Sequence, residues 1–268
     1  MVYFLCSFYK EAEEIILYYN LKKEFSYSSF QIFCNEYIKL IISGIGKINA
    51  ACAIGYIGRE TVKNSEDIII NIGICGGRSR NIGEGILVNK IIDVDTKREF
   101  YPDIILKHEF EEGTLQTFTT PVVDGNVKDI CDMEGSAFFE CASKFFENHQ
   151  IAIIKVVSDK ADGSKVELKC LGELIKKNMS KVNLYIKNYE NVFYKEKFLS
   201  DVCTRNMERL VQVLRLTESQ KIEIKRAMVA YKIRNNKEFD FSGFLKLEVK
   251  IKNDGKKYFS KLINDMWA

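Results

Sequence analysis

The sequence predicts an α/β fold with a mixed or largely parallel sheet, followed by a helical extension. In residues 1–165, short runs rich in Ile, Val and Leu alternate with segments whose apolar residues recur at helical spacing. Beyond Val166 only helical patterns remain. The charge changes at the same place, because residues 1–165 carry a net −6 (18 basic and 24 acidic side chains) and residues 166–268 a net +9 (22 and 13).

The expected elements start at the first residues of the chain. A buried strand at residues 2–6 runs into a helix at 11–17. Further strands are predicted at 30–33, 37–42, 67–77, 85–92, 113–118 and 151–157, the first two forming a hairpin around Asn35. An apolar helix ends near Gly58, residues 98–102 form a loop, and residues 121–125 form a turn.

An amphipathic helix is predicted to open at Glu134. Phe138, Cys141, Ala142 and Phe145 recur at i, i+3, i+4 and i+7, which places them on one face of this helix. Glu134 stands at or just before the first turn, where the positive end of the helix dipole favours an ionised carboxylate.

The extension is predicted to consist of helices. They span 168–189, interrupted by Gly172, then 198–216, then residues up to 234, and finally 256–267 after a turn at 253–255. The third of them opens with a capping box in which Thr217 is the N-cap and Gln220 is at N3.

Composition excludes several classes of protein. No segment approaches the roughly 18 to 20 apolar residues that a membrane helix needs, and the N-terminus lacks the basic region of a signal peptide. The 8 Cys include no CxxC pair and indicate buried free thiols in a reducing cytoplasm. His108 and His149 are the only histidines, so no metal site is expected. A Lys-rich solvated surface explains the basic tail better than nucleic-acid binding does.

Two glycine-rich stretches follow predicted strands. Residues 43–51 have the sequence SGIGKINAA, in which backbone N–H groups can meet an anion or a hydroxyl. This is not a phosphate-binding P-loop, and Asn49 replaces the third glycine of a dinucleotide fingerprint. A tight turn explains it equally well. The second stretch, NIGICGG at 71–77, allows a ligand to approach the backbone closely or lets a strand bend at a barrel corner.

Carboxylates stand at the ends of predicted elements. Glu134 opens a helix and Asp159 ends a strand, and we predict that they frame a site for a small, hydroxyl-rich ligand. Glu11 lies where the first strand meets the first helix, and ligands of α/β sheets gather beyond such strand ends; a favourable helix dipole is the alternative explanation. Asp162 is interpreted as a turn or capping residue, and Asp132 has no role beyond the start of its motif.

Four motifs now stand in one order, namely SGIGKINAA, NIGICGG, DMEGSA (132–137) and SDKADG (158–163). Together they resemble the nucleoside phosphorylase superfamily, most closely its 5′-methylthioadenosine/S-adenosylhomocysteine nucleosidases. The resemblance covers about residues 1–190 and leaves 191–268 as a basic helical extension. It implies a three-layer α/β/α fold around a mixed, partly barrel-like sheet and a homo-oligomer, of which a dimer is favoured. The cytoplasmic localisation is expected from the cysteines.

The resemblance also implies roles for individual residues. Glu11 matches the glutamate that activates water, Glu134 with Met133 matches the pair that binds the ribose hydroxyls, and Asp159 matches the proton donor to the purine. The substrate-binding set further includes Gly76, Ile74, Ser158 and Val122. Such chemistry needs no cofactor, because an acid beside the base and a carboxylate beside the ribose promote departure of adenine.

The expected substrate is a 5′-modified adenosine such as 5′-methylthioadenosine, S-adenosylhomocysteine or 5′-deoxyadenosine. Phosphorylases of this superfamily hold phosphate partly with an Arg and a Ser, and the matching positions here are Asn71 and Ile74, so water is the expected nucleophile. The nucleosidases usually have Ser where Ile74 stands. A phosphorylase and a nucleoside-binding protein without activity remain the alternatives.

Two features have no firm assignment in the sequence. Val122 and Phe118 are candidates for stacking on adenine, although packing explains both. The helical extension is either a solvated appendage or a module that binds a protein partner.

Overall fold

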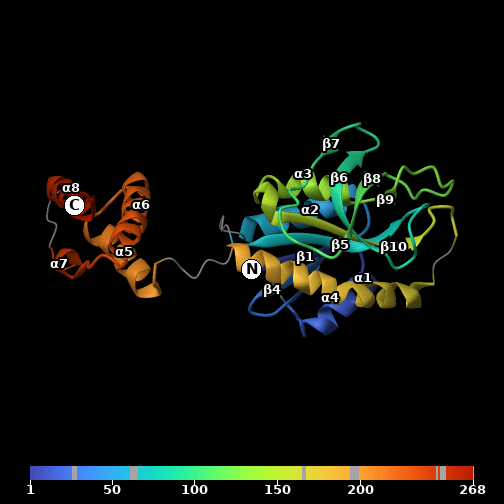
Figure 1. Ribbon diagram of the computed structural model, residues 1–268, viewed down its shortest axis with the longest axis horizontal. Coiled ribbons are helices and arrows are strands. Elements are labelled where there is room, and N and C mark those ends of the chain that lie inside the picture. The colour runs from blue at the N-terminus through green and yellow to red at the C-terminus, as the bar shows by residue number, and fades with distance from the viewer. Residues whose placement is uncertain are drawn as a thin grey trace. The chain divides into compact units, whose positions relative to one another are not determined.

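A computed structural model describes residues 1–25, 29–60, 66–164, 167–193, 199–245, 247 and 252–267. The chain divides into two compact units, Met1–Phe193 and Tyr194–Ala268 (Figure 1). The predicted boundary between residues 190 and 191 therefore falls inside the last turn of a helix, α4 (Leu168–Phe193).

The first unit is built on one ten-stranded mixed sheet. Its strands are β1 (Val2–Cys6), β2 (Lys22–Lys23), β3 (Gln31–Cys34), β4 (Ile38–Ile42), β5 (Ile68–Gly76), β6 (Gly85–Asp93), β7 (Glu99–Phe100), β8 (Glu111–Thr117), β9 (Ile130–Asp132) and β10 (Ile151–Asp159). Their order is β10-β6-β8-β9-β5-β1-β4-β3-β2, with β7 beside β6. Since β5 pairs with both β10 and β9, the strands β5, β10, β6, β8 and β9 close into a ring, as expected for a partly barrel-like sheet.

The central strands are apolar on both faces because helices cover both. In β1, the side chains of Val2, Phe4 and Cys6 enter one buried cluster, whereas Tyr3 and Leu5 enter the other. This alternation follows from the two-residue period of a strand. A strand buried on both faces has a nearly continuous apolar sequence, which is why these strands were predictable.

Helices form the outer two layers (Figure 1). One face of the sheet packs against α1 (Tyr9–Tyr18) and α4, which contribute Ala12, Ile15, Ile175 and Met179 to the first cluster. The other face packs against α2 (Lys47–Glu60) and α3 (Gly135–Ala142). The prediction of a three-layer α/β/α fold is confirmed. A single 3-10 turn, η1 (Asn148–Gln150), precedes β10.

Several local predictions are wrong. Residues 98–102 are not all loop, because Glu99 and Phe100 form β7, whose pairing with β6 is not encoded locally. The short strands β2 and β9 were not predicted for the same reason. Gly172 does not interrupt α4, which runs without a break from Leu168 to Phe193. A Cβ at Gly172 would make only an ordinary van der Waals contact with Glu14 Cγ (3.6 Å), so the packing of α4 against α1 does not require a glycine there. α3 ends at Ala142, so Phe145 follows the helix.

The second unit contains α5 (Asp201–Val213), α6 (Glu218–Asn235), α7 (Ser242–Leu245) and α8 (Lys252–Trp267) around a core of its own. Thr217 caps α6 in the predicted capping box with Gln220. The predicted turn at 253–255 is wrong, because those residues belong to the first turn of α8, where Gly255 is buried. The predicted helix start at Phe198 lies outside the described residues.

Two general features concern the whole described chain. None of its helices is both long and apolar enough to cross a membrane. All eight cysteines are free thiols, but only Cys6, Cys75, Cys131 and Cys203 are buried, so burial of most of them is not observed.

Candidate functional site

A cavity of about 240 Å³ opens where β1, β5 and β10 end and α1 and α3 begin. Its lining includes every residue that the sequence predicted for the site, namely Glu11, Ile74, Gly76, Val122, Met133, Glu134, Ser158 and Asp159. The parallel strands β1, β5 and β10 end at the same edge of the sheet, which is why segments remote in the sequence meet there.

Glu11 lines this cavity and is held by three backbone hydrogen bonds. The residue stands in the first turn of α1 and its side chain is buried. Its Oε2 accepts hydrogen bonds from the backbone N–H groups of Ser7 (2.8 Å) and Phe8 (3.3 Å), and its Oε1 accepts one from Ile74 (2.8 Å). The glycine stretch makes room for it, because a Cβ on Gly73 would lie 2.6 Å from Oε1.

The environment of Glu11 suits a base that works near neutrality. Burial raises its pKa to about 7, against the opposing effects of Lys155 and of the N–H groups of Ile74 and Ser7. A general base is most effective when its pKa lies near the working pH.

Glu134 is the N-cap of α3, where the sequence placed it. Its Oε1 accepts a hydrogen bond of 2.6 Å from the N–H of Gly46, in the first glycine-rich turn. That turn does present an N–H group to an anion, as predicted, and the anion is a carboxylate of the protein itself. Burial and the neighbouring Asp132 raise the pKa of Glu134, while Lys155 and Gly46 oppose this, so a helix dipole alone does not describe its ionisation.

Asp132 and Lys155 form a buried ion pair that the sequence analysis missed. Lys155 lies in the middle of β10, and its Nζ is 2.9 Å from Asp132 Oδ2, with both side chains only 1% exposed. Asp132 also accepts hydrogen bonds from the N–H of Gly135 (2.8 Å) and the hydroxyl of Thr117 (2.8 Å). The prediction that Asp132 has no role beyond the start of its motif is therefore wrong, because Asp132 lines the cavity and pairs with the ammonium of Lys155.

Lys155 is the cation for three carboxylates. Burial alone would lower its pKa, but Asp132, Glu134 and Glu11 together raise it well above the ordinary value. The signal was present in the sequence: a lone lysine in an apolar run that becomes a buried strand must have a carboxylate partner.

Asp159 is the last residue of β10 and also lines the cavity. Its Oδ2 accepts a hydrogen bond from the hydroxyl of Ser158 (2.7 Å), and its Oδ1 accepts one from the N–H of Ala161 (2.8 Å). The second glycine of the NIGICGG stretch makes room here, because a Cβ on Gly76 would lie 3.0 Å from Asp159 Oδ1. The site thus combines carboxyl groups from the first turn of α1, the N-cap of α3 and the end of β10.

The rest of the lining is mainly apolar. Phe8, Ile45, Pro121, Val122 and Met133 contribute to it, whereas Phe118 does not. No lysine or arginine occurs among the described residues that line the cavity. The arrangement can bind a ligand that combines an apolar part with hydroxyl groups, and it disfavours an anion such as phosphate.

Comparison with known proteins gives a likeness of fold. No protein-family model and no curated protein matches the chain. The 5′-methylthioadenosine/S-adenosylhomocysteine nucleosidase of Neisseria meningitidis, solved with methylthio-immucillin-A, is 21% identical (TM-score 0.56, covering 70% of this chain and 98% of that one). The S. pneumoniae nucleosidase is 16% identical (0.55, 70% and 98%). The Arabidopsis thaliana 5′-methylthioadenosine nucleosidase is 18% identical (0.57, 69% and 95%).

The sheet, its two helical layers and these neighbours agree with the resemblance that the four motifs indicated. The chain has the nucleoside phosphorylase fold of the 5′-methylthioadenosine/S-adenosylhomocysteine nucleosidases, with additional C-terminal helices.

Proposed function

We propose that this protein hydrolyses the N-glycosidic bond of a 5′-modified adenosine to give adenine and a ribose derivative. The observation that carries the proposal is the meeting of Glu11, Glu134 and Asp159 at one cavity, each supplied by a different element. Candidate substrates are 5′-methylthioadenosine, S-adenosylhomocysteine and 5′-deoxyadenosine.

Each carboxylate takes one step of the reaction. Asp159 donates a proton to N7 of adenine, which makes the base a better leaving group as the bond from C1′ to N9 breaks. Glu134 accepts the ribose 2′- and 3′-hydroxyls and stabilises the positive charge that develops on the sugar. Glu11 removes a proton from water as the water oxygen bonds to C1′. A pKa of about 7 leaves Glu11 substantially ionised at neutral pH.

Water is favoured over phosphate because of the charges around the cavity. Besides the proton donor Asp159, three carboxylates line it, namely Glu11, Asp132 and Glu134, and the nearby ammonium of Lys155 is already paired with Asp132. A phosphate group would meet this negative charge without a free cation among the described lining residues. Ile74, where the nucleosidases usually have Ser, contributes its backbone N–H to Glu11 instead of a side-chain hydroxyl.

The test measures adenine release from each of the three nucleosides by the full-length protein, with and without phosphate. We expect release that does not depend on phosphate. Glu134→Gln and Asp159→Asn each lower kcat/KM by about 100-fold or more, the usual contribution of such groups. Asp129→Asn is the matched control, since Asp129 pairs with Arg80 (2.6 Å) and does not line the cavity.

Other outcomes would change the assignment. Phosphate-dependent release with a sugar 1-phosphate product would make the protein a phosphorylase. Calorimetric binding of the nucleosides without any product would make it a nucleoside-binding protein. Full turnover by Glu134→Gln would contradict the assigned site.

We further propose that the first unit forms a homodimer in a reducing, cytoplasmic compartment. Ile45 lines the cavity and is 55% exposed, and Ile48, one residue beyond the start of α2, is 80% exposed. Exposed apolar side chains beside a ligand site suit a second copy of the chain. Sedimentation analysis should show a dimer that Ile48→Glu weakens and Leu17→Glu, an exposed residue on α1, does not; a monomeric wild-type protein would contradict this.

The second unit is proposed to bind a protein partner. Val202, Ile222 and Ile233 are exposed apolar residues on its helices. They favour a protein over nucleic acid, which is bound mainly through phosphate contacts. Affinity capture with Ile222→Glu as the negative control tests this; identical proteins captured by both forms would count against it.

A further inference from the structure

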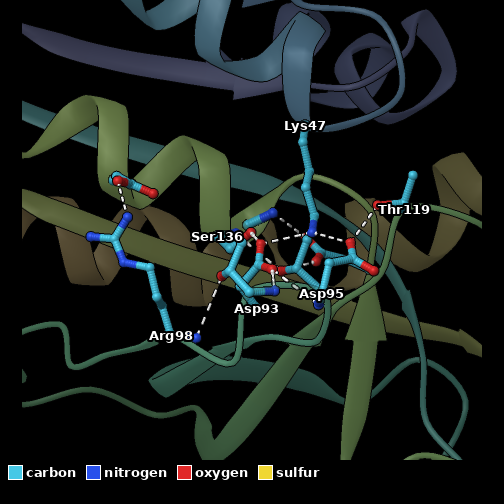
Figure 2. Close-up of polar contacts among 11 residues, drawn as sticks. Lys47, Asp93, Asp95, Arg98, Thr119 and Ser136 are labelled. Atoms are coloured by element: carbon cyan, nitrogen blue, oxygen red, sulfur yellow. Dashed lines mark hydrogen bonds and ion pairs between the residues drawn. The ribbon is translucent and has the colours of Figure 1, made fainter.

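A polar network joins the glycine turn to α3 behind the cavity. Figure 2 shows Lys47, the first residue of α2, reaching Asp93, the last residue of β6, and Asp95, two residues further along the chain. Its Nζ lies 2.7 Å from Oδ2 of Asp93 and 2.7 Å from Oδ2 of Asp95. The inner aspartate, Asp93, has a side chain only 10% exposed, whereas that of Asp95 is 52% exposed. The two acids are therefore not equivalent.

Asp93 contacts the two segments that the hydrogen bond between Gly46 and Glu134 joins, the glycine turn and the start of α3. Its Oδ2 accepts a hydrogen bond of 2.7 Å from the hydroxyl of Ser136, two residues after Glu134 (Figure 2). The same oxygen pairs with Lys47, which directly follows Gly46, the donor to Glu134. A closed chain of contacts thus runs from Asp93 through Lys47 and Gly46 to Glu134, and back through Ser136.

The carboxylate of Asp93 is itself fixed. Its Oδ1 accepts backbone hydrogen bonds from Asp95 (3.1 Å) and Thr96 (2.9 Å), which close a tight turn at the end of β6. Although burial alone would raise the pKa of Asp93, the bonds from Lys47, Ser136 and Thr96 hold it well below its usual range. Asp93 is therefore ionised throughout the pH range in which an enzyme of this kind is assayed.

None of the three anchoring residues touches the ligand space. The described residues that line the cavity do not include Lys47, Asp93 or Ser136. They do include Glu134, which accepts the hydrogen bond from the N–H of Gly46. The contacts of Asp93 therefore lead to a bound nucleoside through Glu134. Other titratable groups that face Asp93 are Lys47 from α2 and Asp95 from the following turn.

We propose that Asp93 is a positioning residue for the ribose-binding carboxylate: by holding Lys47 and Ser136 together, it keeps Glu134 oriented toward the sugar hydroxyls. This inference rests on the proposed role of Glu134. Its consequence is specific, because loss of Asp93 weakens only the part of binding and catalysis that the two hydroxyls supply. A misplacement of about 1 Å at a reacting group can cost about 100-fold in rate.

The experiment compares a ribonucleoside with its 2′,3′-dideoxy analogue on the full-length protein. Asp93→Asn should lower kcat/KM for the ribonucleoside by about 100-fold, and should change that for the dideoxy analogue little. Ser136→Ala, which removes one arm only and leaves the ion pair, should show the same selectivity to a smaller extent. Asp129→Asn should show no such selectivity, and Lys47→Arg should retain most of the wild-type preference because it keeps the ion pair.

The readout separates the two proposals. Equal losses on both nucleosides, or no loss in either Asp93→Asn or Ser136→Ala, would overturn the positioning role while leaving the nucleosidase proposal intact. If the wild-type protein binds without turnover, the same ratio of affinities measured by calorimetry decides the matter. The proposed function, and this inference with it, would be overturned by a wild-type protein that binds neither nucleoside. An unchanged kcat/KM in Glu134→Gln would have the same consequence.

Discussion

Replacement of the buried lysine by methionine should strongly destabilise the first unit. Lys155→Met keeps a side chain of similar length but removes the ammonium that faces Asp132, Glu134 and Glu11. At 2.9 Å, the attraction between Lys155 and Asp132 is about 6 kcal/mol for an effective dielectric constant of about 20. Desolvation of both ions offsets part of it, and removal of one partner from a buried pair typically costs about 3–5 kcal/mol.

The cost can be converted to a melting temperature. One kcal/mol shifts the midpoint by roughly 2–4 °C in a domain of about 150–250 residues. Calorimetry should therefore show a fall of about 10 °C for Lys155→Met at about pH 8. The matched control is Lys90→Met, because Lys90 makes an exposed ion pair with Glu99 (2.8 Å) and should leave the midpoint close to that of the wild type.

The pH dependence gives a second check. Lys155 lowers the pKa values of Glu11 and Glu134, so these values rise further in the variant. A carboxyl group with a raised folded-state pKa contributes stability that is present at low pH and is lost as the pH rises through that value. The gap between variant and wild type should therefore narrow from about pH 8 to about pH 5.

A double variant completes the test. Lys155→Met combined with Asp132→Asn removes both partners and should recover a substantial part of the lost stability. A midpoint within about 2 °C of the wild type for the single variant, or a gap that widens on acidification, would refute the account of the carboxylate cluster.

The environment of Glu11 and the separate cores of the two units allow three further tests. Because the pKa of Glu11 is raised to about 7, kcat/KM should increase as the pH rises through about 7; persistence of this rise in Glu11→Gln would show that another group causes it. Gly73→Ala places a Cβ 2.6 Å from Glu11 Oε1, so kcat should fall by about 10-fold or more in steady-state assays. The control is Gly55→Ala, whose Cβ meets nothing within 4 Å and which should leave kcat unchanged. Equal effects of the two substitutions on kcat would contradict the placement of Glu11. A chain ending at Phe193 retains both core clusters and should keep the wild-type kcat and KM, so loss of turnover would show that the second unit takes part in catalysis.

Elements buried on both faces were predictable from the sequence. β5 and β10 carry apolar runs that have no other explanation in a chain of this composition. The strands β7 and β9 were not predictable, because two or three residues have no periodicity and only pairing with β6 and β8 makes them strands. Gly172 shows the converse, since burial of the apolar face of α4 against the sheet overrides the weak helix propensity of one glycine.

The sequence pointed to the acidic residues of the candidate site, but it did not point to the buried lysine beside them. Glu11, Glu134 and Asp159 stand at the ends of elements, where a sequence pattern can locate them. Lys155 lies in the middle of a strand, and its partner Asp132 reaches it only because β5, β9 and β10 close the ring. The role proposed for Asp93 depends likewise on three segments that meet only in the folded chain.

In the proposed reaction, water attacks C1′ of the ribose as adenine departs. The most direct measurement is the reaction of 5′-methylthioadenosine in heavy-oxygen water without phosphate, followed by mass spectrometry of the products. Hydrolysis by water should give free adenine and a ribose derivative that carries one heavy oxygen at C1′. An intact nucleoside, or an unlabelled sugar 1-phosphate formed only when phosphate is added, would contradict it.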